Sequence, residues 1–345
     1  MIPTVPVQAI AGLTVAALAL LVAHPAAAQT EADFFRGKTI ALGIPSDVGG
    51  GYDAHGRLLA RHLAKHIPGN PSVIAQNLAA GAGLVLANNL YTTAPRDGTA
   101  IAILRASVMY EQIYGNKAVR FSASDFNWIG NLNSAQDSCV FWNTVAVKAP
   151  ADFYVREYVM GSDGVAGMDY SFPRIYNELL GTKFKLVTGY KGTPDRILAM
   201  QRGEIDGACG MTTGLVKSVL RQQHKEGKLR LVAQAGFTRD PDFPDVPNML
   251  DQATTPEQRQ ALEFIYAQLQ LSRAVAAAPG LPEARVATLR KAFDATMADP
   301  AFRNEARKLN LDLLPIGGAD TANVVQRFFS SPGSVVERVR SAVRK

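Results

Sequence analysis

Short apolar runs and apolar residues at helical spacing alternate along this chain. The first run, over 40–44, predicts a buried strand that ends at Pro45. Helical spacing then predicts a helix over 53–67 with Asp53 as its N-cap. Three glycines at 49–51 lie between the two elements. A strand, a glycine loop and a helix N-terminus present free backbone N–H groups, which bind anions without a charged side chain. A tight strand-to-helix turn needs the same glycines, so both readings stay open.

The alternation continues through most of the chain, which is typical of α/β folds with parallel sheets. Further strands are expected over 72–75, 99–104, 140–147, 158–160, 184–188, 204–209, 228–234 and 272–278. Further helices are expected from 84 to 93, over 173–180, from Thr193 to Gly203, and from Pro282 and Pro300 onwards in a mostly helical C-terminal part.

Two successive sets of strands and helices indicate two similar lobes. In open α/β sheets, ligands bind beyond the carboxyl ends of the strands. The loops at those ends are 46–53, 81–83, 105–107, 161–167, 190–192 and 210–214. We therefore expect a ligand held between the two lobes, with short crossings near 137–140 and 236–247 acting as a hinge.

The N-terminus has the pattern of an export signal. Residues 1–28 contain no Lys, Arg, Asp or Glu, and an apolar run over 11–23 is followed by Ala26, Ala27 and Ala28. The run is too short to span a bilayer, which takes about 20 apolar residues. We expect cleavage after Ala28 and an exported protein.

The charge balance favours an anionic ligand but not nucleic acid. The formal net charge is +6, and basic residues are interspersed with acidic ones except near the C-terminus. Neither a Gly-x-x-x-x-Gly-Lys-Ser/Thr nor a Gly-x-Gly-x-x-Gly motif is present, so nucleotide binding is not expected. The two cysteines, Cys139 and Cys209, lie in apolar segments, and a disulfide and two buried thiols both stay open.

Short motifs in a fixed order give the chain a family resemblance. They are Pro45-Ser-Asp-Val-Gly-Gly-Gly-Tyr-Asp53, Gly81-Ala-Gly83, Ala94-Pro-Arg-Asp-Gly98, Tyr190-Lys-Gly192, Gly203-Glu-Ile-Asp206, Phe243-Pro-Asp-Val-Pro247 and Ala278-Pro-Gly-Leu-Pro282. With these motifs, the chain resembles the Bug family, the periplasmic solute-binding receptors of tripartite tricarboxylate transporters. The resemblance covers essentially the whole chain after the signal.

The resemblance implies a two-lobed α/β type II periplasmic-binding-protein fold with the ligand cleft between the lobes. The first lobe would comprise 31–137 and 240–345, and the second 138–239. Such a protein is a receptor, not an enzyme, and uses no cofactor or metal. It would capture a small carboxylate as a monomer and deliver it to membrane permease subunits.

Site residues follow from the resemblance by position. In the first lobe they are Ser46, Asp47, Gly50, Gly51, Tyr52, Asp53, Ala82 and Gly83. In the second lobe they are Ser162, Asp163, Gly164, Gly210, Met211 and Thr212. The chain departs from the family pattern at Tyr52, where Thr is usual, at Leu84, where Gly is usual, and at Asp47, where an apolar residue is usual.

Two charged candidates carry alternative readings. Arg105, with Ser107 close behind it, follows a predicted strand, where a guanidinium group can bind a carboxylate through two hydrogen bonds. An outward-facing loop arginine would show the same position. Asp163 lies in a helix-opening loop, where it would cap the helix or bind an amine.

Other classes of function remain as alternatives. An exported hydrolase or isomerase would use a similar cleft, although no Gly-x-Ser-x-Gly motif is present and Asp53 with His55 is better explained by a helix cap. A sensor partner of a membrane kinase would share the fold and the ligand. His62 and His66 have zinc-ligand spacing on a helix, but no carboxylate stands at ligand spacing beside them, and a solvated helix face is the better explanation.

Overall fold

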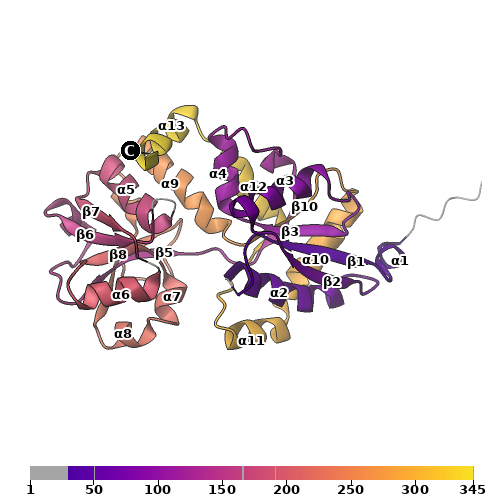
Figure 1. Cartoon of the computed structure of the whole chain (residues 1–345), viewed down its shortest axis with the longest axis horizontal. Coiled ribbons are helices and arrows are strands. Elements are labelled where there is room, and N and C mark those ends of the chain that lie inside the picture. The colour runs from indigo at the N-terminus through magenta and orange to yellow at the C-terminus, as the bar shows by residue number, and fades with distance from the viewer. Residues whose placement is uncertain (1–29, 50, 165–166, 191, 345) are drawn as a thin grey trace, which may run out of the picture.

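The structure is a computed structural model that describes residues 30–49, 51–164, 167–190 and 192–344, and it contains two β-sheets. The signal peptide and Gly50 of the predicted site lie outside the described residues. Figure 1 shows one lobe around each sheet, with α9 extending from one lobe towards the other.

The six-stranded sheet has the order β11-β4-β10-β3-β1-β2. Its strands are β1 (Thr39–Ile44), β2 (Ser72–Asn77), β3 (Ala100–Leu104), β4 (Asn127–Asn131), β10 (Ala274–Ala277) and β11 (Ile316–Gly317). The five-stranded sheet has the order β7-β6-β8-β5-β9. Its strands are β5 (Asp137–Trp142), β6 (Tyr158–Ser162), β7 (Phe184–Thr188), β8 (Gly207–Thr212) and β9 (Leu229–Ala235).

The helices cover these sheets. They are α1 (Glu31–Phe35), α2 (Gly51–Leu63), α3 (Leu84–Thr92), α4 (Ala106–Ile113), α5 (Met168–Leu180), α6 (Thr193–Gln201), α7 (Thr213–Lys217), α8 (Arg221–Lys225), α9 (Pro256–Gln270), α10 (Glu283–Ala298), α11 (Pro300–Lys308), α12 (Gly318–Phe329) and α13 (Gly333–Arg344). Short 3₁₀ helices are η1 (Ala64–His66), η2 (Ala80–Gly83), η3 (Ala123–Asp125), η4 (Pro150–Tyr154) and η5 (Met249–Gln252).

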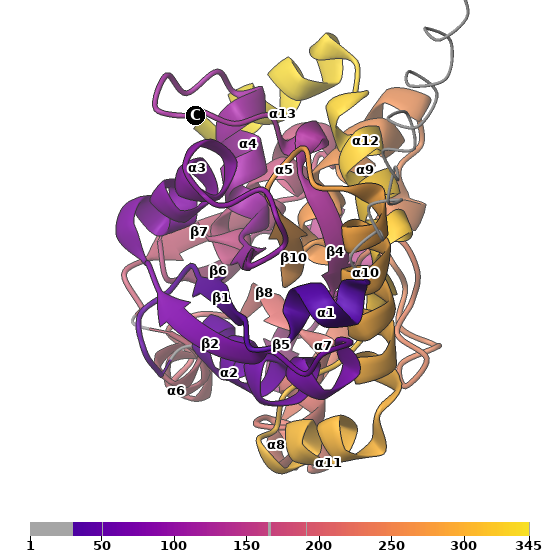
Figure 2. The ribbon, with the colours of Figure 1, turned by 90° about the vertical axis from the view of Figure 1, so that its right-hand side faces the viewer.

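Glycines let two helices approach β1 closely from opposite faces of the sheet, as Figure 2 shows for α2 and α3. A Cβ on Gly56 of α2 would lie 2.6 Å from the Ile44 side chain, and one on Gly43 would lie 2.5 Å from Leu86 of α3. Alternate residues of β1, such as Ile40 and Leu42, are fully buried under α2. This packing fixes the N-terminus of α2 at the carboxyl end of β1.

The prediction of parallel sheets is only partly correct, because both sheets are mixed. β1 pairs in parallel with β2 and β3, and β6 with β7 and β8. However, β10 runs antiparallel to β3 and β4, and β5 runs antiparallel to β8 and β9. β5 and β10 are the strands by which the chain enters a sheet from the other lobe, so they begin at the interlobe edge.

Most predicted elements are present, with shifted ends. The strand expected over 140–147 is β5, which ends at Trp142, and the helix expected over 173–180 begins earlier, at Met168. Asp53 is the third residue of α2 and not its N-cap. The pattern analysis missed β4 and α4.

The two predicted crossings are wrong in position. Residues 137–140 are already part of β5, so the first crossing lies before them, at 132–136. The 236–247 segment stays bound to β9, since Gln234 Nε2 donates to the carbonyl oxygens of Phe243 and Val246 at 2.7 and 3.0 Å. The chain returns to the first sheet through α9, which runs between the lobes in Figure 1.

The crossings lie side by side at the base of the cleft. The backbone N–H of Leu132 donates to Arg273 at 3.2 Å, that of Ala135 donates to Leu269 at 2.9 Å, and that of Ser134 donates to Leu314 at 2.8 Å. Two chain crossings, at 132–136 and 271–273, thus connect the lobes there, and the segment at Leu314 of the first lobe lies against the first of them. The last helix, α13, packs on α5 and α9 and therefore contacts the second lobe.

Cys139 and Cys209 form a disulfide in the structure, which is one of the two outcomes the sequence left open. It joins neighbouring strands β5 and β8 in the buried core of the second lobe.

Candidate functional site

The loop after β1 is held in place from below by the Asp53 carboxylate. Its Oδ2 accepts from the Gly49 backbone N–H at 2.9 Å, and its Oδ1 accepts from Asn77 Nδ2 and pairs with Arg57 Nε, both at 2.9 Å. Asn77 also donates to the Ser46 carbonyl at 2.8 Å. The loop is thereby tied to α2 and to the end of β2.

The same bonds give Asp53 a structural role. The side chain is buried, and burial alone would raise its pKa, but the bonds from Arg57, Gly49 and Asn77 outweigh burial and lower it. A fully bonded carboxylate has little capacity left for a solute. Asp53 therefore shapes the predicted site without facing it.

Other first-lobe candidates lie around this loop. Ser46 is buried and its hydroxyl donates to the Asp47 carbonyl at 3.1 Å, while the Asp47 side chain is exposed. Gly51 opens α2 and is exposed. Ser107 is exposed in the first turn of α4.

Arg105 faces the loop and does not point away from the protein, so the outward-facing reading is wrong. Its Nε donates to the Pro45 carbonyl at 3.0 Å, and its guanidinium carbon lies 4.7 Å from the centre of the Tyr52 ring. Its two Nη nitrogens form no hydrogen bond with the described residues. The edge that binds a carboxylate through two hydrogen bonds is thus left open.

Arg273 is a neighbour that the sequence reasoning missed. Ala274 pairs with Leu104 in the antiparallel β10–β3 ladder, so Arg273 lies opposite Arg105. Its guanidinium carbon is 3.9 Å from the centre of the Tyr52 ring. The signal was a basic residue at the start of the strand expected over 272–278, but only antiparallel pairing brings it to this edge.

The second glycine loop, η2, borders the same place. Gly81, Ala82 and Gly83 all have positive φ, at 60°, 53° and 92°. A Cβ on Gly83 would lie 3.0 Å from the Pro45 side chain and 3.6 Å from Arg105. This close approach joins the two first-lobe loops into one surface.

In the second lobe, a buried arginine organises the loop after β6. Arg196 of α6 pairs through Nη1 with Asp169 at 3.0 Å and through Nε with Asp163 at 3.2 Å. Asp169 also accepts from the Asp163 backbone N–H at 2.6 Å. Asp163 is half-exposed, and burial raises its pKa despite Arg196. It does not cap α5, whose N-cap is Gly167.

The remaining second-lobe candidates are engaged locally. The Ser162 hydroxyl contacts the Gly164 backbone at 3.2 Å, and Gly210, with φ of 74°, packs against the backbone of Asp169. Thr212 caps α7 through Leu215. The Met211 side chain is fully buried, so any contact with a solute would involve its backbone.

The lobes touch at the base of the cleft. A Cβ on Gly214 of α7 would lie 1.7 Å from Asp312 Oδ2, so this carboxylate rests on the second lobe. Burial raises the pKa of Asp312. His55 contacts the carbonyl oxygens of Gly51 and Asp312 at 2.7 and 3.2 Å, and burial, together with Arg273, lowers its pKa.

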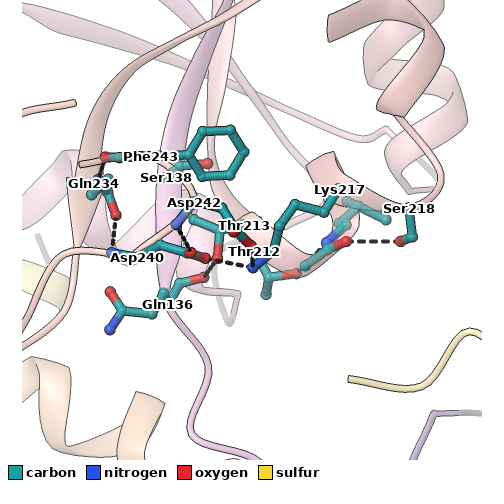
Figure 3. A network of polar contacts seen from close by, with 12 residues as sticks. Gln136, Ser138, Thr212, Thr213, Lys217, Ser218, Gln234, Asp240, Asp242 and Phe243 are labelled. Atoms are coloured by element: carbon teal, nitrogen blue, oxygen red, sulfur yellow. Dashed lines mark hydrogen bonds and ion pairs between the residues drawn. The ribbon is translucent and has the colours of Figure 1, made fainter. Parts of the chain in front are cut away.

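A polar network stiffens the second lobe beside this contact (Figure 3). Lys217 of α7 pairs with Asp240 and Asp242, each at 2.9 Å, and Gln234 accepts from the Asp240 backbone N–H at 2.7 Å. Burial alone would lower the pKa of Lys217, but these two carboxylates raise it. The segment after β9 therefore moves with the second lobe.

The histidine pair of α2 and η1 is bound to carboxylates of the α11 region. His62 pairs with Glu305 at 2.6 Å, and His66 pairs with Asp299 at 3.2 Å. Within the described residues, no group of three or more His, Cys, Asp or Glu side chains is arranged to hold a metal. Within the same residues, no helix is long and apolar enough to cross a membrane.

Two α/β lobes, each with glycine loops at the carboxyl ends of its strands, have the architecture of a two-lobed binding protein. The family model for the tripartite tricarboxylate transporter family receptor, TctC, matches residues 56–340, and the chain belongs to this family. A Cupriavidus necator protein described as the UPF0065 protein in the gbd 5' region is 26% identical over 344 residues, with 95% of each chain covered.

Solved structures support the same fold. A TctC solute-binding protein from Polaromonas is 18% identical with a TM-score of 0.70, over 88% of this chain and 98% of that one. MatC from Rhodopseudomonas palustris with bound malate is 19% identical with a TM-score of 0.57, over 89% of this chain and 99% of that one. An R. palustris protein with adipate is 17% identical with a TM-score of 0.58, over 88% of this chain and 97% of that one. The predicted family and the two-lobed α/β fold are thus confirmed.

Proposed function

We propose that this receptor captures a small carboxylate between its lobes and delivers it to the permease of a tripartite tricarboxylate-type transporter. The observation that carries the proposal is the open edge of Arg105. Its Nε donates to the Pro45 carbonyl, its guanidinium carbon lies 4.7 Å from the centre of the Tyr52 ring, and neither Nη has a partner among the described residues. A guanidinium group held this way is preorganised for a carboxylate.

Backbone amides complete the proposed contact. Pro45, at the start of the first loop, and the left-handed turn at 81–83 lie against Arg105, and the N-terminus of α2 adds the positive end of a helix dipole. In the second lobe, Ser162 to Gly164 and Gly210 to Thr212 would meet the other end of the solute. The structures with malate and adipate, both carboxylates, support this solute class.

The two lobes, expected from the sequence at 31–137 with 240–345 and at 138–239, would close on the solute about the crossings at 132–136 and 271–273. The contacts of α13 and of 236–247 with the second lobe suggest that these two pieces move with it. We further propose export to the periplasm through cleavage after Ala28, action as a monomer, and no enzymatic activity.

Thermal-shift screening against carboxylates tests the proposal. A solute present at 100 times its dissociation constant adds about 2.7 kcal/mol of stability, which raises the melting temperature measurably. We expect malate, adipate or a related carboxylate to stabilise the protein, and Arg105→Ala to lose about 1.5–3 kcal/mol of binding free energy, the range for a charge-assisted hydrogen bond. Stabilisation by neutral sugars and by no carboxylate would refute the proposal.

A further inference from the structure

Tyr52 carries two guanidinium groups on one ring. Arg105 and Arg273 approach its centre to 4.7 and 3.9 Å, so the separation of the two guanidinium carbons cannot exceed the sum of these distances. Each contact has cation–π geometry, which attracts an arginine to the ring without neutralising its charge. Two positive charges are thus held close together beside Tyr52, next to the first glycine loop.

Neither charge is balanced nearby. Among the described residues, no carboxylate pairs with Arg105 or with Arg273. The nearest acidic residue of α2, Asp53, is paired with Arg57. Two like charges at close range repel each other, and a bound anion would relieve that repulsion.

Arg273 presents a free donor to the loop. Its Nη1 donates to the Ser272 carbonyl at 2.7 Å, and its Nε is buried without a partner. Its Nη2 forms no hydrogen bond with the described residues and lies 3.1 Å from where a Cβ on Gly51 would be. The donor therefore lies at the N-terminus of α2.

The backbone of Arg273 is fixed on both sides. Its N–H donates to Asn131 Oδ1 at 2.9 Å, and its carbonyl accepts from the Leu132 N–H at 3.2 Å. It is also the residue at which the chain, returning from α9, enters β10. A group bound to Arg273 would therefore contact the segment where the lobes join.

We propose that Arg273 joins Arg105 in binding one oxyanion of the solute, and that Tyr52 is the positioning residue for both guanidinium groups. This inference rests on the proposed function, in which the oxyanion is a carboxylate. The same two guanidinium groups would also bind a free inorganic oxyanion such as sulfate. The family resemblance does not predict this pair of arginines on an aromatic ring, because Tyr52 stands where Thr is usual.

The test compares Arg273→Gln with Arg230→Gln, a matched control in the second lobe. Arg230 also has a buried Nε without a partner and donates to carbonyl oxygens, those of Asn143 and Val145. By calorimetry with malate and adipate, we expect affinity to fall about ten- to a hundredfold in Arg273→Gln, the range of a charge-assisted hydrogen bond. In Arg230→Gln we expect a change of less than about twofold. Tyr52→Leu should lose affinity, and Tyr52→Phe, which keeps the ring, should bind more tightly than Tyr52→Leu.

A second arm uses no carboxylate. Millimolar sodium sulfate is compared with sodium chloride at equal ionic strength by melting temperature. We expect sulfate to stabilise wild type and Arg230→Gln more than Arg273→Gln, since the general salting effect is common to all three. Without added anion and at low ionic strength, Arg273→Gln should melt higher than wild type, because it removes the repulsion.

The outcomes separate the two proposals. Sulfate stabilisation that depends on Arg273, without binding of any carboxylate, would retain the oxyanion site and refute the proposed function. Carboxylate binding that is equal in Arg273→Gln and Arg230→Gln would retain the function and overturn this inference. Absence of both responses would overturn both.

Discussion

A single carboxylate, that of Asp53, holds the loop on which the proposed carboxylate contact depends. We predict that Asp53→Ala lowers the free energy of unfolding by about 2–3 kcal/mol, because Gly49, Asn77 and Arg57 lose one shared buried partner. Urea denaturation measures the change. Asp47→Ala, on the exposed part of the same loop, should stay within about 0.5 kcal/mol of wild type. Equal effects of the two substitutions would contradict the role given to Asp53.

Asp137 is a second residue whose burial has a measurable consequence. It is fully buried, its Oδ2 has no hydrogen-bond partner, and burial raises its pKa to about 7. Its Oδ1 accepts from the Ser138 N–H. The charged groups near it are Arg196 and Asp169, and the paired hydroxyls of Tyr176 and Tyr266 are close by.

The direction of its pH dependence follows from this raised pKa. Between the ordinary value of 3.8 and about 7, the folded protein keeps a proton that the unfolded chain has lost. Stability from Asp137 is therefore complete below pH 3.8 and declines as pH rises towards 7, by up to about 1.4 kcal/mol per pH unit. We predict that Asp137→Asn removes this decline, measured by urea denaturation across that range. Asp47→Asn, at an exposed position, is the control, and an unchanged slope in Asp137→Asn would show that Asp137 does not cause it.

At the scale of elements, the disulfide joins two strands that are 70 residues apart in sequence. A cross-link closing a loop of this length restricts the unfolded chain by about 4 kcal/mol in the chain-entropy account. We predict that the Cys139→Ser/Cys209→Ser variant loses stability of this order relative to wild type in urea. If reductant destabilises wild type but leaves the variant unchanged, the disulfide is the cause. A variant as stable as wild type would mean that the thiols are not joined.

Local sequence patterns predicted β1 and β7 from their apolar runs and α10 from Pro282 at its start. They failed where the structure depends on pairing between strands that are far apart in the sequence. The antiparallel entry of β5 and β10 depends on how the chain crosses between lobes, and neither strand's composition encodes direction. For the same reason Arg105 was predictable from its place after a strand, whereas Arg273 required the β10–β3 register.

At the scale of the molecule, two lobes joined by short crossings can close as rigid bodies. Each lobe is internally tied, the first loop by Asp53 and the second lobe by Lys217 with its two aspartates. We expect the motion to be concentrated at the crossings 132–136 and 271–273. A solute that contacts both lobes would favour the closed form, which gives a permease a means to recognise a loaded receptor.

Gly214 offers a direct test of closure, because the Asp312 carboxylate rests on it. An added Cβ there would lie 1.7 Å from Asp312 Oδ2, so Gly214→Ala should hold the lobes apart. We predict about tenfold weaker malate or adipate binding and a smaller solute-induced decrease in radius of gyration by small-angle scattering. Gly214→Ala/Asp312→Ala should restore both, since the obstructing carboxylate is gone. Gly333→Ala, where an added Cβ meets nothing within 4 Å, is the control. Wild-type affinity and wild-type compaction in Gly214→Ala would show that this contact does not belong to the closed form.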